Sequence, residues 1–447
     1  MKKSAAFHTL GCKVNRYETD AIAQTFMQAG FQIKDFSESA DVYVINTCTV
    51  TGEADRKSRQ MLRQAKKRNP DALVIAMGCH VEQSDASAYA DIMVGNGEKM
   101  KTVETVMNVL ETRGTPISGN ITIPFSGSGK IFLAKAAPDD TFEEMGIVTS
   151  QDETRAFIKI EDGCNNFCSY CIIPYVRGRV RSRDESAIMQ EAQELANKGF
   201  QEIVLTGIHV CSYGAENDFE KNSLIELTEK LSGIKGIGRI RFGSLEPPSI
   251  TPDFIAKASN IDYLCPHFHI SLQSGSDTVL QRMNRRYSTH DFADIIKKLR
   301  EAIPDVMVTT DIITGFPGET EYEHQQTLDF CREMRFISMH VFKYSLRKGT
   351  KAASMGNQVD PKTAARRSDE LIALAQEMKE VHFRNAVGKR FSVLVETCDE
   401  EGAAGYTGNY MPAKIIFNNP KKVNDFIIGS IVEVMADRYD KDYIYCS

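Results

Sequence analysis

Residues 1–125 alternate short apolar runs with longer stretches in which apolar positions recur every three or four residues. The pattern predicts strands at residues 5–10, 41–46 and 72–77, and helices at residues 17–29 and 54–68. Gly30 and the pair Asn69-Pro70 predict where the two helices end. Strands that alternate with helices favour an open parallel sheet, whose ligands bind at the carboxyl ends of the strands.

Residues 126–152 differ in texture, because glycine and serine cluster there before an acidic run, and this predicts a linker. The alternation resumes over residues 153–382, where strands are predicted at residues 156–161, 202–206, 239–244, 267–272, 307–313 and 338–342. Six strand–helix units predict a partial (β/α)6 barrel, since a complete barrel of this kind has eight.

Residues 383–447 have the pattern of an all-β region, with short strands predicted at residues 390–396, 403–407, 413–417 and 431–437. Glycine and asparagine lie between them, which is typical of a small antiparallel β-barrel of oligonucleotide-binding size. The predicted fold class is therefore α/β, with an N-terminal open parallel-sheet domain, a central partial (β/α)6 barrel and a C-terminal β-barrel.

Composition and charge narrow the function classes. Of the 447 residues, 42% are apolar and 26% are charged, which is ordinary for a globular protein, and the net charge is −6. A chain of this charge binds nucleic acid only through local basic patches. The apolar runs are of strand length, and no secretory pattern precedes the first strand, so we expect no membrane partner and a cytoplasmic location.

The 11 cysteines are an odd number without an export signal, which favours metal or catalytic roles over disulfides. Cys164, Cys168 and Cys171 lie in one short segment just after a predicted strand. Three thiolates in one loop suit a 4Fe–4S cluster with one iron open to a substrate. The alternative is a zinc knuckle completed by a distant residue such as Cys211, although zinc sites usually take four ligands in paired spacing.

Three further cysteines, Cys12, Cys48 and Cys79, each follow the end of one predicted strand of the first domain. In a parallel sheet these ends lie on one edge, so the three thiols are expected to meet at one point. Three thiolates again predict a cluster with an open iron. The alternative is three unrelated, half-buried thiols, because free cysteine is often buried.

The spacing C-x3-C-x2-C, with Tyr170 before its last cysteine, resembles the radical S-adenosylmethionine superfamily. With the N-terminal cysteines, nearly the whole chain resembles the methylthiotransferases, whose terminal barrel is of the TRAM type. The resemblance implies two 4Fe–4S clusters and S-adenosylmethionine as cofactors. It implies that the N-terminal cluster supplies sulfur, that one S-adenosylmethionine methylates it, and that another generates the radical that abstracts hydrogen from the substrate.

Three short sequence segments indicate which substrate subclass the chain resembles. Thr9-Leu-Gly-Cys-Lys-Val-Asn15, residues 54–60 and residues 267–277 resemble the MtaB-type enzymes, which act on N6-threonylcarbamoyladenosine in tRNA. His80 after Cys79 departs from the tyrosine or aliphatic residue that is commoner there. The resemblance implies methylthiolation at C2 of that nucleoside, beside the anticodon. The alternatives are methylthiotransferases acting on isopentenyladenosine in tRNA or on a ribosomal protein, and a non-enzymatic iron–sulfur sensor that binds RNA.

The candidate site residues fall into three sets. The catalytic and metal-ligating cysteines are Cys12, Cys48, Cys79, Cys164, Cys168 and Cys171. The candidate cofactor-binding positions are Tyr170, which precedes the last cysteine of the loop, and a set near strand ends, where cofactors of such barrels bind: Thr206, Gly207, Ser244, Glu246, Gln273, Ser274, Asp311 and Gly315. Basic residues that are candidates for RNA contacts are Arg56, Arg59, Arg177, Arg179, Arg347 and Lys414.

Each of the last two sets has a plainer interpretation. The glycines near Asp311 also fit an ordinary strand-to-helix turn, and the arginines also fit solvated helix faces. The partners that we expect are tRNA and a flavodoxin- or ferredoxin-like electron donor, with the chain acting as a monomer.

Overall fold

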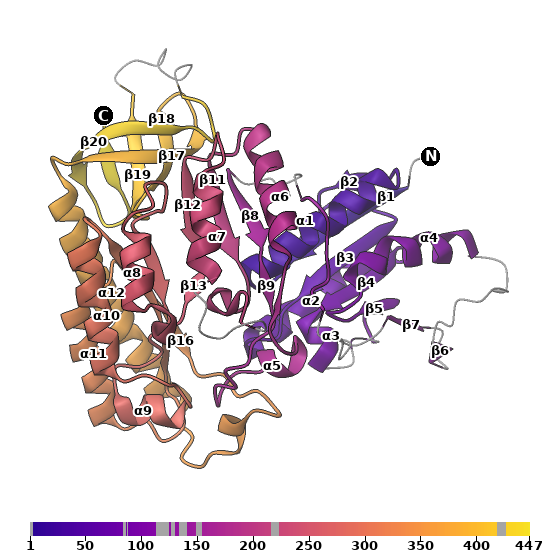
Figure 1. Cartoon of the computed structure of the whole chain (residues 1–447). Helices are drawn as coiled ribbons and strands as arrows, with labels where there is room; N and C mark the ends of the chain where they lie inside the picture. The colour runs from indigo at the N-terminus through magenta and orange to yellow at the C-terminus, as the bar shows by residue number, and fades with distance from the viewer. Residues whose placement is uncertain are drawn as a thin grey trace.

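The computed structural model describes residues 3–83, 86, 88–112, 125–126, 130–133, 141–148, 154–215, 223–417 and 426–447. Its chain forms three regions that follow one another along the sequence (Figure 1). An N-terminal sheet, a central set of parallel strands covered by helices, and a small C-terminal barrel confirm the predicted α/β fold class.

The N-terminal region is a seven-stranded sheet in the order β2-β1-β3-β4-β5-β7-β6. Its strands are β1 (Ser4–Thr9), β2 (Gln32–Lys34), β3 (Val42–Thr47), β4 (Leu73–Gly78), β5 (Ile92–Val94), β6 (Phe125–Ser126) and β7 (Lys130–Leu133). All pairings are parallel except that of β6 with β7. Every residue of β3 and β4 is buried, as expected for central parallel strands with both faces covered.

Helices cover both faces of this sheet. They are α1 (Lys13–Gln28), α2 (Gly52–Arg68), α3 (Cys79–Gln83), the 3-10 helix η1 (Lys99–Lys101) and α4 (Thr102–Thr112). Ile22 and Phe26 of α1 pack with Val106 of α4 on one face, and Leu62 of α2 packs with Val81 of α3 on the other. The sequence predicted the helices α1 and α2 but missed the short strands β2 and β5 and the helix α4.

The prediction of a linker over residues 126–152 is wrong near the start of that segment. Lys130–Leu133 pairs with β5 and so belongs to the N-terminal sheet. Met145 and Val148 pack against Tyr17 and Ala21 of α1, so the end of this segment is also held against the fold. The other residues of the segment that lie at 127–129, 134–140 and 149–152 are outside the described part of the chain.

The central region has parallel strands in two sheets, β12-β11-β8 and β13-β14-β15-β16. The strands are β8 (Arg155–Lys159), β11 (Glu202–Thr206), β12 (Arg239–Phe242), β13 (Ser244–Leu245), β14 (His267–Ile270), β15 (Met307–Thr314) and β16 (Ser338–Lys343). Only Gly243 separates β12 from β13, so the chain makes six strand positions in succession, as predicted for a partial barrel. A small hairpin pairs β9 (Glu161–Asp162) with β10 (Arg181–Ser182).

The helices of the central region surround one large apolar core. They are α5 (Ile173–Val176), α6 (Glu185–Asn197), α7 (Ser223–Ser232), α8 (Pro252–Ala258), α9 (Asp277–Arg282), α10 (Thr289–Ala302) and α11 (Glu321–Met334), with the 3-10 turns η2 (Val210–Ser212), η3 (Pro247–Ser249) and η4 (Lys351–Ser354). Among the described residues, no helix combines the length and apolar composition that crossing a bilayer requires.

The long helix α12 (Pro361–Ala386) leads into the C-terminal barrel, drawn in yellow in Figure 1. Its strands are β17 (Arg390–Cys398), β18 (Gly402–Thr407), β19 (Pro412–Ile416), β20 (Ile431–Tyr439) and β21 (Ile444–Cys446), closed in the order β17-β18-β19-β21-β20. The pairing of β19 with β21 is parallel, so the barrel is not wholly antiparallel as predicted.

The C-terminal barrel covers the amino ends of the central strands. Arg155 at the start of β8 pairs with Glu396, and Arg239 at the start of β12 donates to the Ser392 carbonyl at 2.6 Å. The loop of Cys164, Cys168 and Cys171 lies at the opposite, carboxyl ends of these strands. The C-terminal barrel and this loop are therefore at opposite ends of the central region.

Candidate functional site

The structure brings Cys12, Cys48 and Cys79 to one edge of the N-terminal sheet. Cys12 caps the start of α1, while Cys48 and Cys79 directly follow β3 and β4. Gly11, at φ +102°, lies so close to Cys48 that an added Cβ would be 2.9 Å from its Sγ. Negative charge on Cys79 raises the pKa values of Cys12 and Cys48, and charge on Cys12 also raises the pKa of Cys48, which requires that the three thiols lie close together. The dispersed cysteines therefore converge, as the strand order requires.

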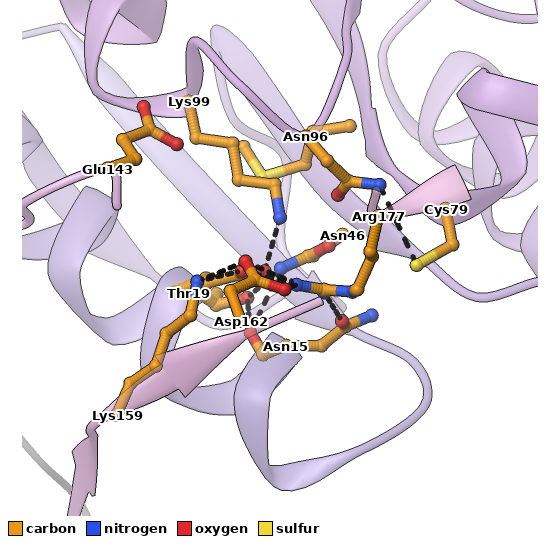
Figure 2. Close-up of polar contacts among 12 residues, drawn as sticks. Asn15, Thr19, Asn46, Cys79, Asn96, Lys99, Glu143, Lys159, Asp162 and Arg177 are labelled. Atoms are coloured by element: carbon orange, nitrogen blue, oxygen red, sulfur yellow. Dashed lines mark hydrogen bonds and ion pairs between the residues drawn. The ribbon is translucent and has the colours of Figure 1, made fainter. Parts of the chain in front are cut away.

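These thiols need a positive partner to ionise. Burial raises the pKa of Cys12 and raises that of Cys48 to about 12. The Asn96 side-chain amide lies 3.9 Å from Cys79 Sγ, where it donates a weak hydrogen bond (Figure 2). A bound metal centre lowers the pKa values of its thiol ligands outright, so raised pKa values do not prevent these cysteines from acting as ligands.

A buried ion network lies beside this trio and links it to the central region (Figure 2). Arg177 Nη1 lies 2.9 Å from Glu18 of α1 and 3.0 Å from Asp162 of β9. Lys159 Nζ lies 2.9 Å from Glu18 and 2.7 Å from Asp162, and Lys99 also pairs with Glu18. Arg181 Nη2 also lies 3.7 Å from Asp162. Four cations thus face two carboxylates, which leaves net positive charge in this largely buried network.

The excess positive charge acts on the cysteines. Arg177 Nη2 donates to Asn15 Oδ1 at 2.7 Å, and its charge lowers the pKa values of Cys12 and Cys48 against the larger effect of burial. Burial opposes the ionisation of Glu18, yet Arg177, Lys159 and Lys99 hold its pKa well below the ordinary value. Arg177 is fully buried, so the prediction that it contacts RNA is wrong.

Arg347 is a second correction among the predicted RNA contacts. Its side chain is buried, pairs with Asp55 of α2 and donates to the Thr49 carbonyl at 3.2 Å. Asp55 also contacts His80 Nδ1 at 2.9 Å, which gives the unusual His80 a role in fixing α3 against α2. Burial opposes ionisation of Asp55, but hydrogen bonds from His80, Thr49 and Arg347 hold its pKa below the ordinary value.

The remaining basic candidates are accessible. Arg56 is exposed and pairs with Glu53, Arg59 is half-buried on the same helix, and Arg179 is exposed in the loop after the second cysteine trio. Lys414 is half-buried on the C-terminal barrel, with its ammonium 4.3 Å from the centre of the Tyr443 ring.

Cys164, Cys168 and Cys171 occupy one loop at the carboxyl end of the central strands. Gly163, at φ +90°, opens the loop, and an added Cβ there would overlap the Arg179 carbonyl at 1.9 Å. The Cys171 amide donates to the Cys168 carbonyl at 2.9 Å. Burial raises the pKa values of both Cys164 and Cys171 to about 12.

Arg285 was missed by the sequence interpretation and contacts this loop directly. Its Nη1 donates to Cys168 Sγ at 3.2 Å, and its Nη2 pairs with Glu246. A cavity of about 140 Å³ lies here, lined by Asn166, Cys168, His209, Glu246, Pro248, Ser249, Asn284, Arg285, Arg286 and Tyr287. Of the predicted cofactor positions, Glu246 is therefore placed beside the second trio.

Glu161 was also missed. It is buried at the start of the loop, and among the described residues its Oε1 has no hydrogen-bond partner. Its Oε2 accepts from the His209 amide at 2.7 Å, and burial raises its pKa well above the ordinary value. An added Cβ on Gly207 would be 2.7 Å from this carboxyl, so Gly207 and the buried Thr206 lie beside Glu161.

The other predicted cofactor positions are spread more widely. Ser244 and Asp311 line a second, larger cavity. Gln273 is held at φ +70° and exchanges backbone hydrogen bonds with β15. The Ser274 hydroxyl lies 3.3 Å from Thr327 of α11, Gly315 approaches Ala364 of α12, and Tyr170 packs in an apolar cluster with Met283 and Phe316. The last three therefore have structural neighbours that account for them.

The two trios are linked by one apolar cluster, which contains a cysteine of the first trio and a residue adjacent to the second. Cys79 packs in one apolar cluster with Ile172 and Val176, and Ile172 is the residue that follows Cys171. Asn96, which contacts Cys79, also donates to the Val176 carbonyl at 2.8 Å. The helices α3 and α5, which begin at or just after the two sites, accordingly pack together. The arrangement places two three-thiol sites on either side of one thin apolar layer.

Each trio offers three thiols, which is the donor chemistry of an iron–sulfur cluster. In the described part of the chain, no three His, Cys, Asp or Glu side chains surround a point where one ion would bind. A cluster spreads its thiolate ligands over different irons, so their sulfur atoms stay farther apart. Hydrogen bonds to the sulfurs, such as that from Arg285 to Cys168, are also typical of such sites.

Comparison with known proteins gives two family matches. A model described as the radical SAM superfamily matches residues 158–331, and one described as uncharacterized protein family UPF0004 matches residues 4–95. The chain is 42% identical over 440 residues to the threonylcarbamoyladenosine tRNA methylthiotransferase MtaB of Bacillus subtilis, with 96% of this chain and 93% of the relative covered.

More distant matches agree on the class. The tRNA-2-methylthio-N(6)-dimethylallyladenosine synthase of Caldicellulosiruptor saccharolyticus is 34% identical over 407 residues, with 88% of this chain and 83% of the relative covered. Among solved structures, the radical S-adenosylmethionine methyltransferase TsrM from Kitasatospora setae superposes with a TM-score of 0.57 at 13% identity, covering 79% of this chain and 74% of that one. At that identity the likeness concerns the fold alone.

Proposed function

This chain belongs to the radical S-adenosylmethionine tRNA methylthiotransferases, and from that premise we propose that it inserts a methylthio group at C2 of N6-threonylcarbamoyladenosine beside the anticodon. The observation that carries the proposal is the apolar cluster that links Cys79 and the residue after Cys171, because sulfur insertion and radical formation must act on one base. The 42% identity to a relative named for this nucleoside supports the choice of substrate.

We assign the two cysteine trios to two clusters. Cys164, Cys168 and Cys171 hold a 4Fe–4S cluster, and Cys12, Cys48 and Cys79 hold a second one. When bound, the clusters and S-adenosylmethionine supply the sulfur, the methyl group and the radical that an unactivated aromatic C–H bond requires.

The chain's own residues position these groups. Arg285 fixes Cys168 by its hydrogen bond and keeps Glu246 turned into the small cavity, where a cofactor's polar groups would be oriented. The excess positive charge around Arg177 compensates the thiolates of the N-terminal trio. The apolar layer of Ile172 and Val176 keeps water from the space between the two sites.

The reaction also needs partners. We propose tRNA as the substrate-bearing macromolecule and a flavodoxin- or ferredoxin-like protein as the electron donor, with the chain acting as a cytoplasmic monomer. Arg56, Arg59, Arg179 and Lys414 are the basic residues left to contact RNA, since each reaches the surface.

Mass spectrometry of tRNA nucleosides tests the proposal. A strain that lacks this gene should lose 2-methylthio-N6-threonylcarbamoyladenosine and accumulate its unmethylthiolated precursor, and the wild-type gene should restore the product whereas Cys168→Ala should not. An unchanged nucleoside profile would reject the proposal.

A second candidate is methylthiolation of isopentenyladenosine, which the 34% identity to a dimethylallyladenosine synthase favours. Loss of the methylthio-isopentenyl nucleoside from the same strain would select it instead.

A further inference from the structure

A second cavity, of about 400 Å³, lies inside the central region and is bounded by all three regions of the chain. Lys13 of α1 reaches it from the N-terminal sheet, and Tyr406 and Tyr410 close it from the C-terminal barrel. His269, Asp311 and His340 line it from the central strands. Lys13 directly follows Cys12, so the residue next to a member of the N-terminal trio contributes to the cavity wall. Its size is sufficient for a modified purine base with its substituent.

The wall where the C-terminal barrel meets the central strands is aromatic and cationic. Tyr410 stacks on Tyr406 with ring centres 4.9 Å apart and on His267 at 4.6 Å. The Arg241 guanidinium lies 4.8 Å from the centre of the Tyr410 ring. Arg241 Nη1 and His267 Nδ1 are both buried and have no hydrogen-bond partner among the described residues. One guanidinium N–H group and one imidazole nitrogen are therefore left unsatisfied beside the cavity, which is costly unless a ligand pairs with them.

Positive charge exceeds negative charge at this wall. Glu202 is the common partner of Arg155, Arg239 and Arg241, at 3.7, 3.3 and 2.8 Å. Glu396 is the second partner of Arg155. Three guanidinium groups thus share two carboxylates, which leaves one positive charge uncompensated before Lys13 is counted.

Lys13 adds a further cation that is free to bind. Its side chain is accessible and lines the cavity, and it makes no hydrogen bond or ion pair with any residue that the structure describes. Of the described lining residues, only Asp311 has a carboxylate, and that carboxylate contacts His269 Nε2 at 3.1 Å. Lys13 therefore has no carboxylate partner, among the described residues, that would compete with an anion entering the cavity.

We propose that this cavity receives the N6 substituent of the target adenosine and that Lys13 binds the carboxylate of that substituent. The inference rests on the proposed function, because the threonylcarbamoyl group has a carboxylate whereas an isopentenyl group is wholly apolar. An apolar substituent would desolvate Lys13 and Arg241 without pairing them. A carboxylate would instead form a charge-assisted hydrogen bond in a site of low dielectric constant. Lys13 therefore selects between the two nucleosides.

Binding of anticodon stem–loops tests this role. Three RNAs of identical sequence would have threonylcarbamoyladenosine, isopentenyladenosine or plain adenosine at the target position, and affinity for the full-length reconstituted protein would be measured by fluorescence anisotropy. Wild type should bind the threonylcarbamoyl RNA about 10- to 100-fold more tightly than the plain RNA, the range for a hydrogen bond to a charged group. Lys13→Gln should abolish this ratio, and Lys13→Arg should restore part of it.

The controls separate the possible outcomes. Lys297→Gln, at an exposed position of α10, should leave every ratio unchanged, and the iron content of Lys13→Gln should equal that of wild type. If Lys13→Gln weakens all three RNAs equally, Lys13 contacts a phosphate and the inference is overturned. It is likewise overturned if Lys13→Gln keeps the wild-type ratio. Preference of the wild type for the isopentenyl RNA would overturn the proposed function itself.

Discussion

The two cysteine trios are built in opposite ways. Cys164, Cys168 and Cys171 lie in one loop, whose path depends on Gly163 and on the contact from Arg285. The other trio comes from three separate loops of the N-terminal sheet. Its members, Cys12, Cys48 and Cys79, meet only because β1, β3 and β4 are neighbouring strands. One site is local in the sequence, and the other exists only in the folded domain.

The difference predicts different vulnerabilities. The local trio, Cys164, Cys168 and Cys171, depends on backbone geometry over a few residues, whereas Cys12, Cys48 and Cys79 form a dispersed trio. The dispersed trio also depends on the ion network of Glu18, Asp162 and Arg177, because that network fixes α1 against the central region and compensates the thiolates. Loss of a charge in the network should therefore affect the N-terminal site before it affects the local one.

The largest effect is expected from Cys168→Ala. This variant should form no detectable 5′-deoxyadenosine from S-adenosylmethionine after reduction, because a site with two thiolates does not retain its cluster. Liquid chromatography of the reaction mixture measures the product. Cys398→Ala, a half-buried cysteine of the C-terminal barrel, is the matched control and should keep wild-type activity. Full cleavage by Cys168→Ala would remove the local trio from the account.

Cys48→Ala should separate the two sites. It should still form 5′-deoxyadenosine but yield no methylthiolated nucleoside, because the sulfur-supplying site is lost while the local trio is intact. Both products can be quantified in one assay with a modified stem–loop. Methylthiolated RNA from this variant would contradict the role assigned to the dispersed trio.

Removing the charge of Arg177 should cost stability. Arg177→Met removes the buried hydrogen bonds from Arg177 to Glu18, Asp162 and Asn15, and breaking such a buried network costs about 3–5 kcal/mol. Arg179→Met, two residues away and exposed, should change the free energy of unfolding by less than about 0.5 kcal/mol. Urea unfolding of both variants gives the comparison. Equal stabilities would show that the network does not join the two regions.

A smaller effect should appear in the pH dependence of stability. The pKa values of Glu18 and Asp162 are depressed in the folded protein, so their contribution to stability is present above the unfolded pKa, about 4.5 for Glu18, and is lost as pH falls through the folded value. In the Arg177→Met variant the folded-state pKa values of Glu18 and Asp162 should be less strongly depressed, because one neighbouring positive charge is lost. The difference in urea midpoint between wild type and Arg177→Met should therefore narrow on acidification from pH 7 toward pH 3. A constant difference would contradict the assigned ion pairs.

The sequence predicted most of the fold because its strands are strongly apolar and separated by clear helix signals. The six central strands and the C-terminal barrel are where the pattern placed them. It missed β2 and β5 because each has only three residues, and it took Lys130–Leu133 for a linker because glycine and serine precede that strand.

The sequence predicted those site residues whose position is determined by the end of a parallel strand. Convergence of Cys12, Cys48 and Cys79 followed from parallel order, but the roles of Arg177, Arg285 and Arg347 did not. Whether an arginine is buried or exposed depends on which elements pack over it, and no local spacing encodes a contact such as that from Arg285 to Cys168. Glu161 gave no signal beyond its place before the cysteine loop.

The central claim is that six thiols form two cluster sites within one reaction space. Anaerobic reconstitution followed by iron and sulfide analysis tests it most directly. The account predicts about eight iron and eight sulfide atoms per chain, falling to about four of each when Cys12, Cys48 and Cys79 are all replaced by alanine. A wild-type value near four, unchanged by that replacement, would contradict it.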